Sequence, residues 1–185
     1  MSKRVLLQNH PLTPATVPTP WARLARDGDV LRLTFRIPGD TSMIVFPARI
    51  EPMVKQLESR RADRLWEHTC FECFLRRDGE AGYLEYNFSP SMEWAAYRLD
   101  TYREGMRNAE VECPAIVATP RPRRFDLSAR IGLPPDWRDS PWHLNLAAVI
   151  EEKDGTKSYW ALRHPAGKPD FHHPDSFILE LPPAP

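Results

Sequence analysis

Residues 68–100, HTCFECFLRRDGEAGYLEYNFSPSMEWAAYRLD, contain the pattern that decides the fold. Within this stretch, aromatic and aliphatic side chains recur at the two-residue period of a β-strand in three runs, 68–76, 82–89 and 93–100. Asp78-Gly79 and Ser89-Pro90 separate the runs, and both pairs are typical of tight turns. The stretch therefore predicts three consecutive antiparallel strands joined by hairpin turns.

The positions of these turns predict how the three strands pair. The first turn places Glu72 opposite Asn87. The second turn places Asn87 opposite Trp94 and Tyr83 opposite Arg98. Because side chains alternate between the two faces of a sheet, one face is apolar and is predicted to be the core side. Its members are Phe71, Cys73, Leu75, Leu84, Tyr86, Phe88, Ala95, Tyr97 and Leu99.

The opposite face of the predicted hairpins is polar but carries two tryptophans. Its members are Trp66, His68, Cys70, Glu72, Glu85, Asn87, Trp94 and Arg98. Tryptophans beside a few fixed polar groups are typical of a small-ligand site, so we expect Trp66 and Trp94 to stack on a ligand. Hydrogen bonds to that ligand are expected from Glu72, Asn87 and Arg98. Two alternatives stay open, an ordinary solvated sheet face and a catalytic carboxylate pair made by Glu72 and Glu85.

Strand-like segments continue on both sides of the central stretch. WARLA and VLRLTFRI form a predicted hairpin across residues 26–29, and further strands are expected at 125–131, 142–150, 158–164 and 176–181. A helix is plausible only over 50–60. The chain has 20 prolines, about twice the usual share of roughly 5%, and proline favours loops and strand ends. We predict one all-β domain over 1–185, a two-sheet antiparallel jelly-roll-like β-sandwich with long proline-rich loops and extended termini at 1–15 and 182–185.

Composition excludes several classes of protein. Lys+Arg and Asp+Glu are both 25, and a neutral chain lacks the basic excess of a nucleic-acid or membrane-surface binder. The apolar run Val5 to Leu7 is too short for a signal peptide, and no run approaches the roughly 18 apolar residues of a membrane helix. Three cysteines do not suggest a disulfide framework. We expect a cytoplasmic protein with neither a nucleic-acid nor a membrane partner.

The Cys70–Cys73 pair has the CxxC spacing of redox and zinc sites, but it lies inside a predicted strand. Residues three apart on a strand point to opposite faces, with α-carbons roughly 10 Å apart, and a disulfide needs less than about 7 Å. No second CxxC completes a zinc site. We therefore expect reduced, buried structural cysteines and no metal at this pair.

The segment 160–175, WALRHPAGKPDFHHPD, concentrates histidine, lysine and aspartate between prolines. Stiff loops of this kind often present binding groups, so His164, Lys168 and Asp170 are candidate ligand contacts beside Trp160. Metal binding and loop-bracing hydrogen bonds are the alternatives. Neither a glycine-rich phosphate loop nor a GxSxG nucleophile motif occurs in the sequence.

Four segments resemble a bacterial group of DOMON-like proteins, over roughly residues 15–182. They are LWEHTCFE (65–72), YLEYNFSPS (83–91), WAAY (94–97) and the tail from Ser158 to His173. The wider superfamily includes family 9 carbohydrate-binding modules and haem-binding DOMON domains, which share a jelly-roll-like β-sandwich. The resemblance implies Trp66 and Trp160 as a stacking pair for a sugar, with Glu72 and Asn87 on its hydroxyls. For a haem-binding relative, His68, Met92 and His164 would be the available axial ligands.

The sequence as a whole predicts a non-catalytic domain that binds a small polar ligand, a saccharide or a sugar-containing metabolite. No cofactor is expected for that function. The first alternative is a haem-binding or redox-sensing module of the DOMON type. A hydrolase and a protein–protein interaction domain are further alternatives, because a fold by itself does not fix a function.

Overall fold

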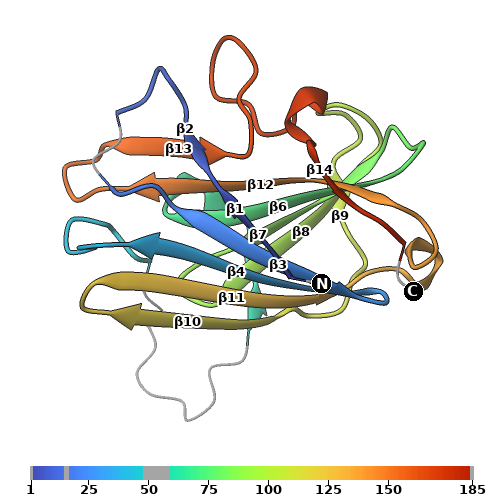
Figure 1. The fold of residues 1–185 in the computed structure, drawn as a ribbon, viewed down its shortest axis with the longest axis horizontal. Helices are drawn as coiled ribbons and strands as arrows, with labels where there is room; N and C mark the ends of the chain where they lie inside the picture. The colour runs from blue at the N-terminus through green and yellow to red at the C-terminus, as the bar shows by residue number, and fades with distance from the viewer. Residues whose placement is uncertain (1, 15–16, 48–58, 184–185) are drawn as a thin grey trace.

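The computed structural model describes residues 2–14, 17–47 and 59–183, and it has two β-sheets packed face to face (Figure 1). Over these ranges the first sheet has five strands in the order β1-β3-β4-β11-β10. They are β1 (Ser2–Leu6), β3 (Trp21–Asp27), β4 (Val30–Pro38), β11 (Arg124–Gly132) and β10 (Ala115–Arg121). The helix predicted over 50–60 lies almost entirely outside the described residues.

The second sheet has nine described strands and carries the central stretch of the sequence in its middle. Its main order is β2 (Gln8–Asn9), β13 (Lys157–Ala161), β12 (Trp142–Glu151), β6 (Cys70–Arg77), β7 (Tyr83–Phe88), β8 (Glu93–Leu99) and β5 (Arg60–Arg61). β14 (Leu179–Leu181) pairs with β12, and β9 (Arg107–Asn108) pairs with β8. Apart from the short parallel pair β5–β8, the described ladders are antiparallel. The predicted two-sheet antiparallel β-sandwich is confirmed.

Short 3₁₀ turns complete the described elements, at Leu65–Glu67, Pro135–Trp137 and Pro174–Ser176. Strand β10 was not predicted, because Pro114 and Pro120 suggested a loop. The strand is tolerated because it is an edge strand that pairs only with β11, and proline removes no ladder hydrogen bond from the free edge. Within the described ranges, no helix combines the length and the apolar character needed to cross a membrane.

The core between the sheets is built from the face that the alternation pattern indicates. Phe71, Cys73, Leu75, Leu84, Tyr86 and Phe88 all belong to this inter-sheet core, as predicted. Their partners from the first sheet include Leu33, Phe35, Phe125 and Leu127. Phe71 packs with Phe35 and Phe125 at ring-centroid distances of 5.2 and 6.0 Å.

The pairing of β6 with β7 is as predicted, and the pairing of β7 with β8 is wrong by one residue. Glu72 lies opposite Asn87, but Asn87 lies opposite Ala95, and Trp94 lies opposite Phe88. Phe88 lies opposite Trp94 and not opposite Glu93, so the connection is one residue longer than predicted, and Met92 within it adopts a left-handed conformation with φ of 64°. A shift of one residue moves every side chain of β8 to the other face.

The outer face of the second sheet is therefore more apolar than the sequence suggested. Ala95, Tyr97 and Leu99 of β8 lie there, and a loop that follows β13 covers part of it. We call residues 162–178 the tail loop. Phe171 and Phe177 of the tail loop pack on this face with Phe74 and Tyr83. The centroid of the Phe74 ring lies 6.4 Å from that of Phe171. A second, smaller apolar cluster thus forms on the side of the sheet away from the inter-sheet core.

Candidate functional site

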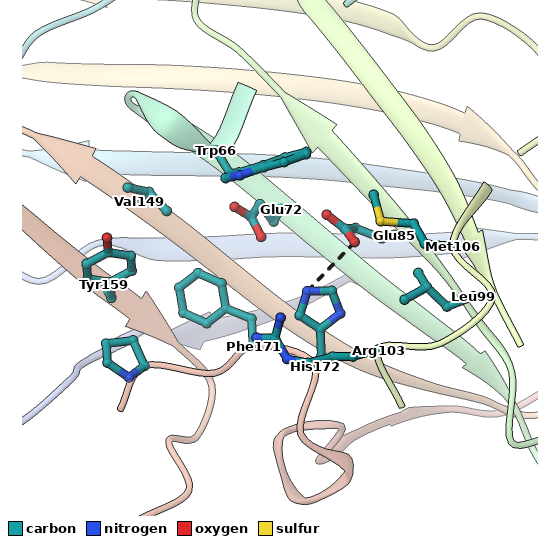
Figure 2. A pocket seen from close by; sticks show the side chains of 11 residues that line it. Trp66, Glu72, Glu85, Leu99, Arg103, Met106, Val149, Tyr159, Phe171 and His172 are labelled. Carbon is teal, nitrogen blue, oxygen red and sulfur yellow. Dashed lines mark ion pairs between the residues drawn. The ribbon is translucent and has the colours of Figure 1, made fainter. Parts of the chain in front are cut away.

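A pocket of about 320 Å³ opens on the outer face of the second sheet (Figure 2). The sheet forms its floor, and the tail loop, the turn before β6 and the loop after β8 form its walls. Its polar side chains are Glu72, Glu85, Arg103 and His172, and its aromatic side chains are Trp66, Tyr159 and Phe171. Leu99, Met106, Val149 and Pro169 supply the remaining apolar lining.

The floor of the pocket holds two buried carboxyl groups on neighbouring strands. Glu72 of β6 is 3% exposed and Glu85 of β7 is 4% exposed. Glu72 lies opposite Asn87, and Asn87 and Glu85 are two residues apart on one strand, so the three side chains share one face. Figure 2 shows both carboxyl groups pointing into the pocket.

These carboxyl groups lack the partners that buried acids usually have. Glu85 Oε1 accepts a hydrogen bond from Asn87 Nδ2 at 2.7 Å, whereas Glu85 Oε2 has no hydrogen bond. Within the described part of the chain, Glu72 makes no hydrogen bond or ion pair, and its Oε1 is buried. Burial raises the pKa of Glu72 well above its ordinary value, and the charge of Glu85 adds to the effect. Burial also raises the pKa of Glu85, against the opposing hydrogen bond from Asn87 and the charge of Arg103.

The tail loop brings His172 to the other side of the pocket. His172 Nδ1 lies 2.8 Å from the phenol oxygen of Tyr83, and its Nε2 lies 3.9 Å from Glu85 Oε2 (Figure 2). Burial and the nearby Arg103 charge lower the pKa of His172 to about 4. The imidazole is therefore neutral at pH 7, and its Nε2 lies too far from Glu85 for a direct hydrogen bond.

Polar contacts fasten the tail loop to the sheet and to the loop after β8. Asp170 Oδ1 accepts from Arg103 Nη2 at 2.8 Å and from the backbone N–H of His172 at 3.0 Å. Asn145 of β12 is fully buried and donates from Nδ2 to the carbonyl of Phe171 at 2.9 Å. These bonds hold the pocket wall in place and neutralise the charge of Arg103.

Three aromatic rings give the pocket flat apolar surfaces. Trp66 is 36% exposed, and its ring packs edge-on against Tyr97 at 5.9 Å between centroids. Across the pocket, Tyr159 of β13 lies beside Phe171 with ring centroids 6.1 Å apart. Rings of this kind offer stacking faces to a small ligand while the carboxyl groups fix its orientation.

Only some of the predicted site residues come together at this pocket. Trp66 and Glu72 line it. Asn87 is fully buried and donates a hydrogen bond to Glu85. Asp170 accepts a hydrogen bond from Arg103, which lines the pocket. Lys168 is exposed and is not among the lining residues. His164 also lies outside the lining, where its Nε2 donates to the carbonyl of Gln8 at 2.8 Å. The loop-bracing alternative therefore describes His164 and Asp170 best.

Trp94, Arg98 and Trp160 are not among the residues that line the pocket. Trp94 is 5% exposed in the inter-sheet core, because the shifted register turns it inward. For the same reason Arg98 lies on the inner side, 3.6 Å from Glu80 and 6.0 Å from the Trp137 ring. Trp160 is 3% exposed in the inter-sheet core, and its Nε1 donates to Ser158 Oγ at 2.9 Å.

Sequence reasoning missed most of the pocket wall. Tyr159 occupies the place expected of Trp160, and the signal was available, because adjacent strand residues point to opposite faces. Glu85 was placed on the polar face but was not chosen as a ligand contact. Arg103 and Phe171 carried no motif that marks them. His172 belongs to the histidine-rich segment that the sequence singled out, although its neighbours were preferred.

The described residues do not offer the haem ligands that the resemblance implied. His68 pairs with Glu151 at 2.6 Å, His164 is bound to Gln8, and Met92 packs against the inter-sheet core. None of the three lines the pocket, so they do not fit as axial ligands there. Over the same residues, no group of three or more His, Cys, Asp and Glu side chains is arranged to hold a metal ion.

Comparison with solved structures finds similar folds among carbohydrate-binding proteins. A candidate carbohydrate-binding protein from Bacteroides uniformis has a TM-score of 0.68 at 16% identity, over 95% of this chain and 84% of that one. A family 9 carbohydrate-binding module from Caldicellulosiruptor kristjanssonii, in complex with cellotriose, has a TM-score of 0.55 at 10% identity, over 98% of this chain and 82% of that one. No protein-family model and no curated protein matches the chain. The fold is thus that of a carbohydrate-binding-module-like β-sandwich.

Proposed function

We propose that the chain is a non-catalytic saccharide-binding domain whose ligand occupies the pocket between Trp66 and the tail loop. The observation that carries the proposal is the pair of buried carboxyl groups, Glu72 and Glu85, each with an oxygen that has no hydrogen-bond partner among the described residues. Buried polar oxygens are normally paired, and the hydroxyl groups of a sugar are donors of the right kind. The ligand therefore completes hydrogen bonding that the protein leaves open.

The aromatic walls support a sugar in particular. A pyranose ring has apolar C–H faces and polar hydroxyl edges, and it matches a site where Trp66 and Tyr159 flank acceptors on the floor. The N–H of His172 adds a donor beside Glu85. A fold shared with a module seen with cellotriose agrees with this ligand class. So does the resemblance of residues 65–72 and 83–91 to DOMON-like proteins.

Titration calorimetry with monosaccharides and disaccharides tests the proposal. Glu72→Ala should weaken binding by about 1.5–3 kcal/mol, the usual worth of a hydrogen bond that involves a charged group. The matched control is Glu180→Gln on β14, an exposed carboxylate outside the pocket, which should leave the affinity unchanged. Affinity that Glu72→Ala leaves intact, or the absence of binding by every sugar tested, would contradict the proposal.

A further inference from the structure

The two carboxyl groups on the pocket floor have no cationic partner with which to ionise, and this points to the chemistry of the ligand. Glu72 and Glu85 bring two carboxyl groups to the floor. Among the described lining residues, the fixed cation is Arg103, and Asp170 already neutralises it at 2.8 Å. His172 is buried between Tyr83 and Glu85 with one ring nitrogen already bonded to the tyrosine. The floor therefore lacks a cation of its own.

Resting on the saccharide-binding function proposed above, we propose that the ligand is an amino sugar whose protonated amine lies between Glu72 and Glu85. Glu72 Oε1 and Glu85 Oε2 are both buried and both without a hydrogen-bond partner. An ammonium group has three N–H donors and carries a positive charge, so it satisfies two carboxylate oxygens at once. The positive charge of the ammonium also favours the ionised form of carboxyl groups that burial alone keeps protonated. A hydroxyl group is uncharged and donates a single hydrogen bond, so it leaves one of the two buried oxygens without a donor.

The walls of the pocket favour a cation over a neutral group. Trp66, Tyr159 and Phe171 present aromatic rings, which attract a cation placed over their faces. Glu72 and Glu85 are 3% and 4% exposed, so water has little access to the carboxyl groups. An attraction between opposite charges is stronger where water is excluded.

The remaining polar groups match the rest of a sugar better than a simple amine. His172 Nε2 and the Arg103 guanidinium are donors at the wall, and hydroxyl oxygens accept from them. An alkylamine has an ammonium group but no hydroxyls for these donors. An N-acetylated sugar has a neutral amide with a single N–H in place of the ammonium, so it donates to only one of the two carboxyl groups. The pocket should therefore prefer a free amino sugar to both.

Titration calorimetry at pH 7 with four probes tests this inference: glucosamine, glucose, N-acetylglucosamine and n-butylamine. The wild-type protein should bind glucosamine at least about tenfold more tightly than the other three, as expected for a hydrogen-bonded charge pair. Glu72→Gln keeps the shape and removes the charge, so it should abolish most of this preference and leave glucose within about threefold of its wild-type affinity. Glu85→Gln should act in the same direction, and Glu180→Gln should change nothing.

The outcomes separate this inference from the saccharide-binding function. Equal affinities for glucose and glucosamine would overturn the inference and leave saccharide binding standing. A preference that persists in both Glu72→Gln and Glu85→Gln would also overturn it. Binding of n-butylamine as tight as that of glucosamine would replace the amino sugar with a simple amine site. Failure of all four probes to bind would overturn both the amino-sugar inference and the saccharide-binding function. Circular dichroism of each variant confirms that it is folded before it is titrated, and two independent carboxyl substitutions keep the test decisive if one variant does not fold.

Discussion

The phenol oxygen of Tyr83 lies 2.8 Å from Nδ1 of His172 and also accepts the backbone N–H of Arg103 at 3.3 Å. The phenol oxygen therefore contacts two segments at once, the tail loop and the loop after β8. When the phenol donates its proton to Nδ1, the neutral imidazole carries its own proton on Nε2, the nitrogen that faces Glu85. Tyr83 thus holds the histidine in position at the pocket wall.

The lowered pKa of His172 makes stability depend on pH on the acid side. Burial and the Arg103 charge lower it from 6.5 to about 4, so the folded state favours the neutral ring. This contribution is fully present above pH 6.5 and is lost as pH falls towards 4. Between pH 7 and 4.5 the wild-type protein should lose roughly 2–3 kcal/mol more than His172→Gln in urea melts. An unchanged slope in His172→Gln would contradict the assignment.

Glu72 should make the protein less stable as pH rises, whereas His172 makes it less stable as pH falls. Burial raises its pKa, so the folded state favours the neutral carboxyl, and stability is lost as pH rises above the ordinary value of 4.5. Glu72→Gln removes this loss, and we expect the variant to be about 1–3 kcal/mol more stable than the wild type at pH 8. The two proteins should approach each other at pH 5. A less stable variant at pH 8 would show that Glu72 has a structural partner.

Phe88 tests the assignment of the inter-sheet core. The side chain is fully buried and stacks with Tyr86 at 6.1 Å. Phe88→Ala should therefore lower the free energy of unfolding by about 3–5 kcal/mol. Val117→Ala, on the edge strand β10 and 59% exposed, is the control and should cost little. A loss of less than about 1 kcal/mol for Phe88→Ala in denaturant melts would show that Phe88 does not face the inter-sheet core.

Arg26 joins the first hairpin to the segment 137–142. Its guanidinium donates to the carbonyls of Ser140 and Trp137 at 3.0 and 3.1 Å and lies 3.4 Å from the centroid of the Trp142 ring. Lysine has neither the planar shape nor the five donors, so Arg26→Lys should cost about 1–3 kcal/mol. Arg32→Lys on the adjacent strand, where the ion pair with Asp27 is exposed, should cost almost nothing. Similar urea midpoints for the two variants would contradict this role.

The three cysteines should differ sharply in reactivity. Cys70 and Cys73 are fully buried and unbridged, whereas Cys113 is exposed. Burial raises the pKa of both buried thiols, which keeps them in the unreactive protonated form. A thiol reagent should therefore label one cysteine in the native protein and three in denaturant. Rapid native labelling of Cys70, or a Cys70–Cys73 disulfide in the mass spectrum, would contradict the strand assignment.

The sequence by itself determined the two-sheet architecture and the placement of Glu72, Glu85 and Asn87 on one face of the second sheet. The Asp78-Gly79 turn set the pairing of Glu72 with Asn87, because a turn with a recognisable glycine fixes the register of the strands it joins. Alternation within β6 and β7 then separated the inter-sheet core from the outer face. The cytoplasmic location stays a prediction, as does the extent of the single domain.

Only the tertiary structure decided which face β8 presents and what surrounds the two carboxyl groups. Met92 takes a left-handed conformation that glycine usually supplies, so the connection that is one residue longer left no signal in the sequence, and Trp94 lies in the core. The approach of His172 to Glu85 depends on the path of the tail loop, which Asn145 and Arg103 anchor through contacts far apart in sequence. Local patterns determine the faces of a strand because alternation is a property of the backbone, whereas a pocket wall made by a loop depends on long-range packing that no local pattern contains.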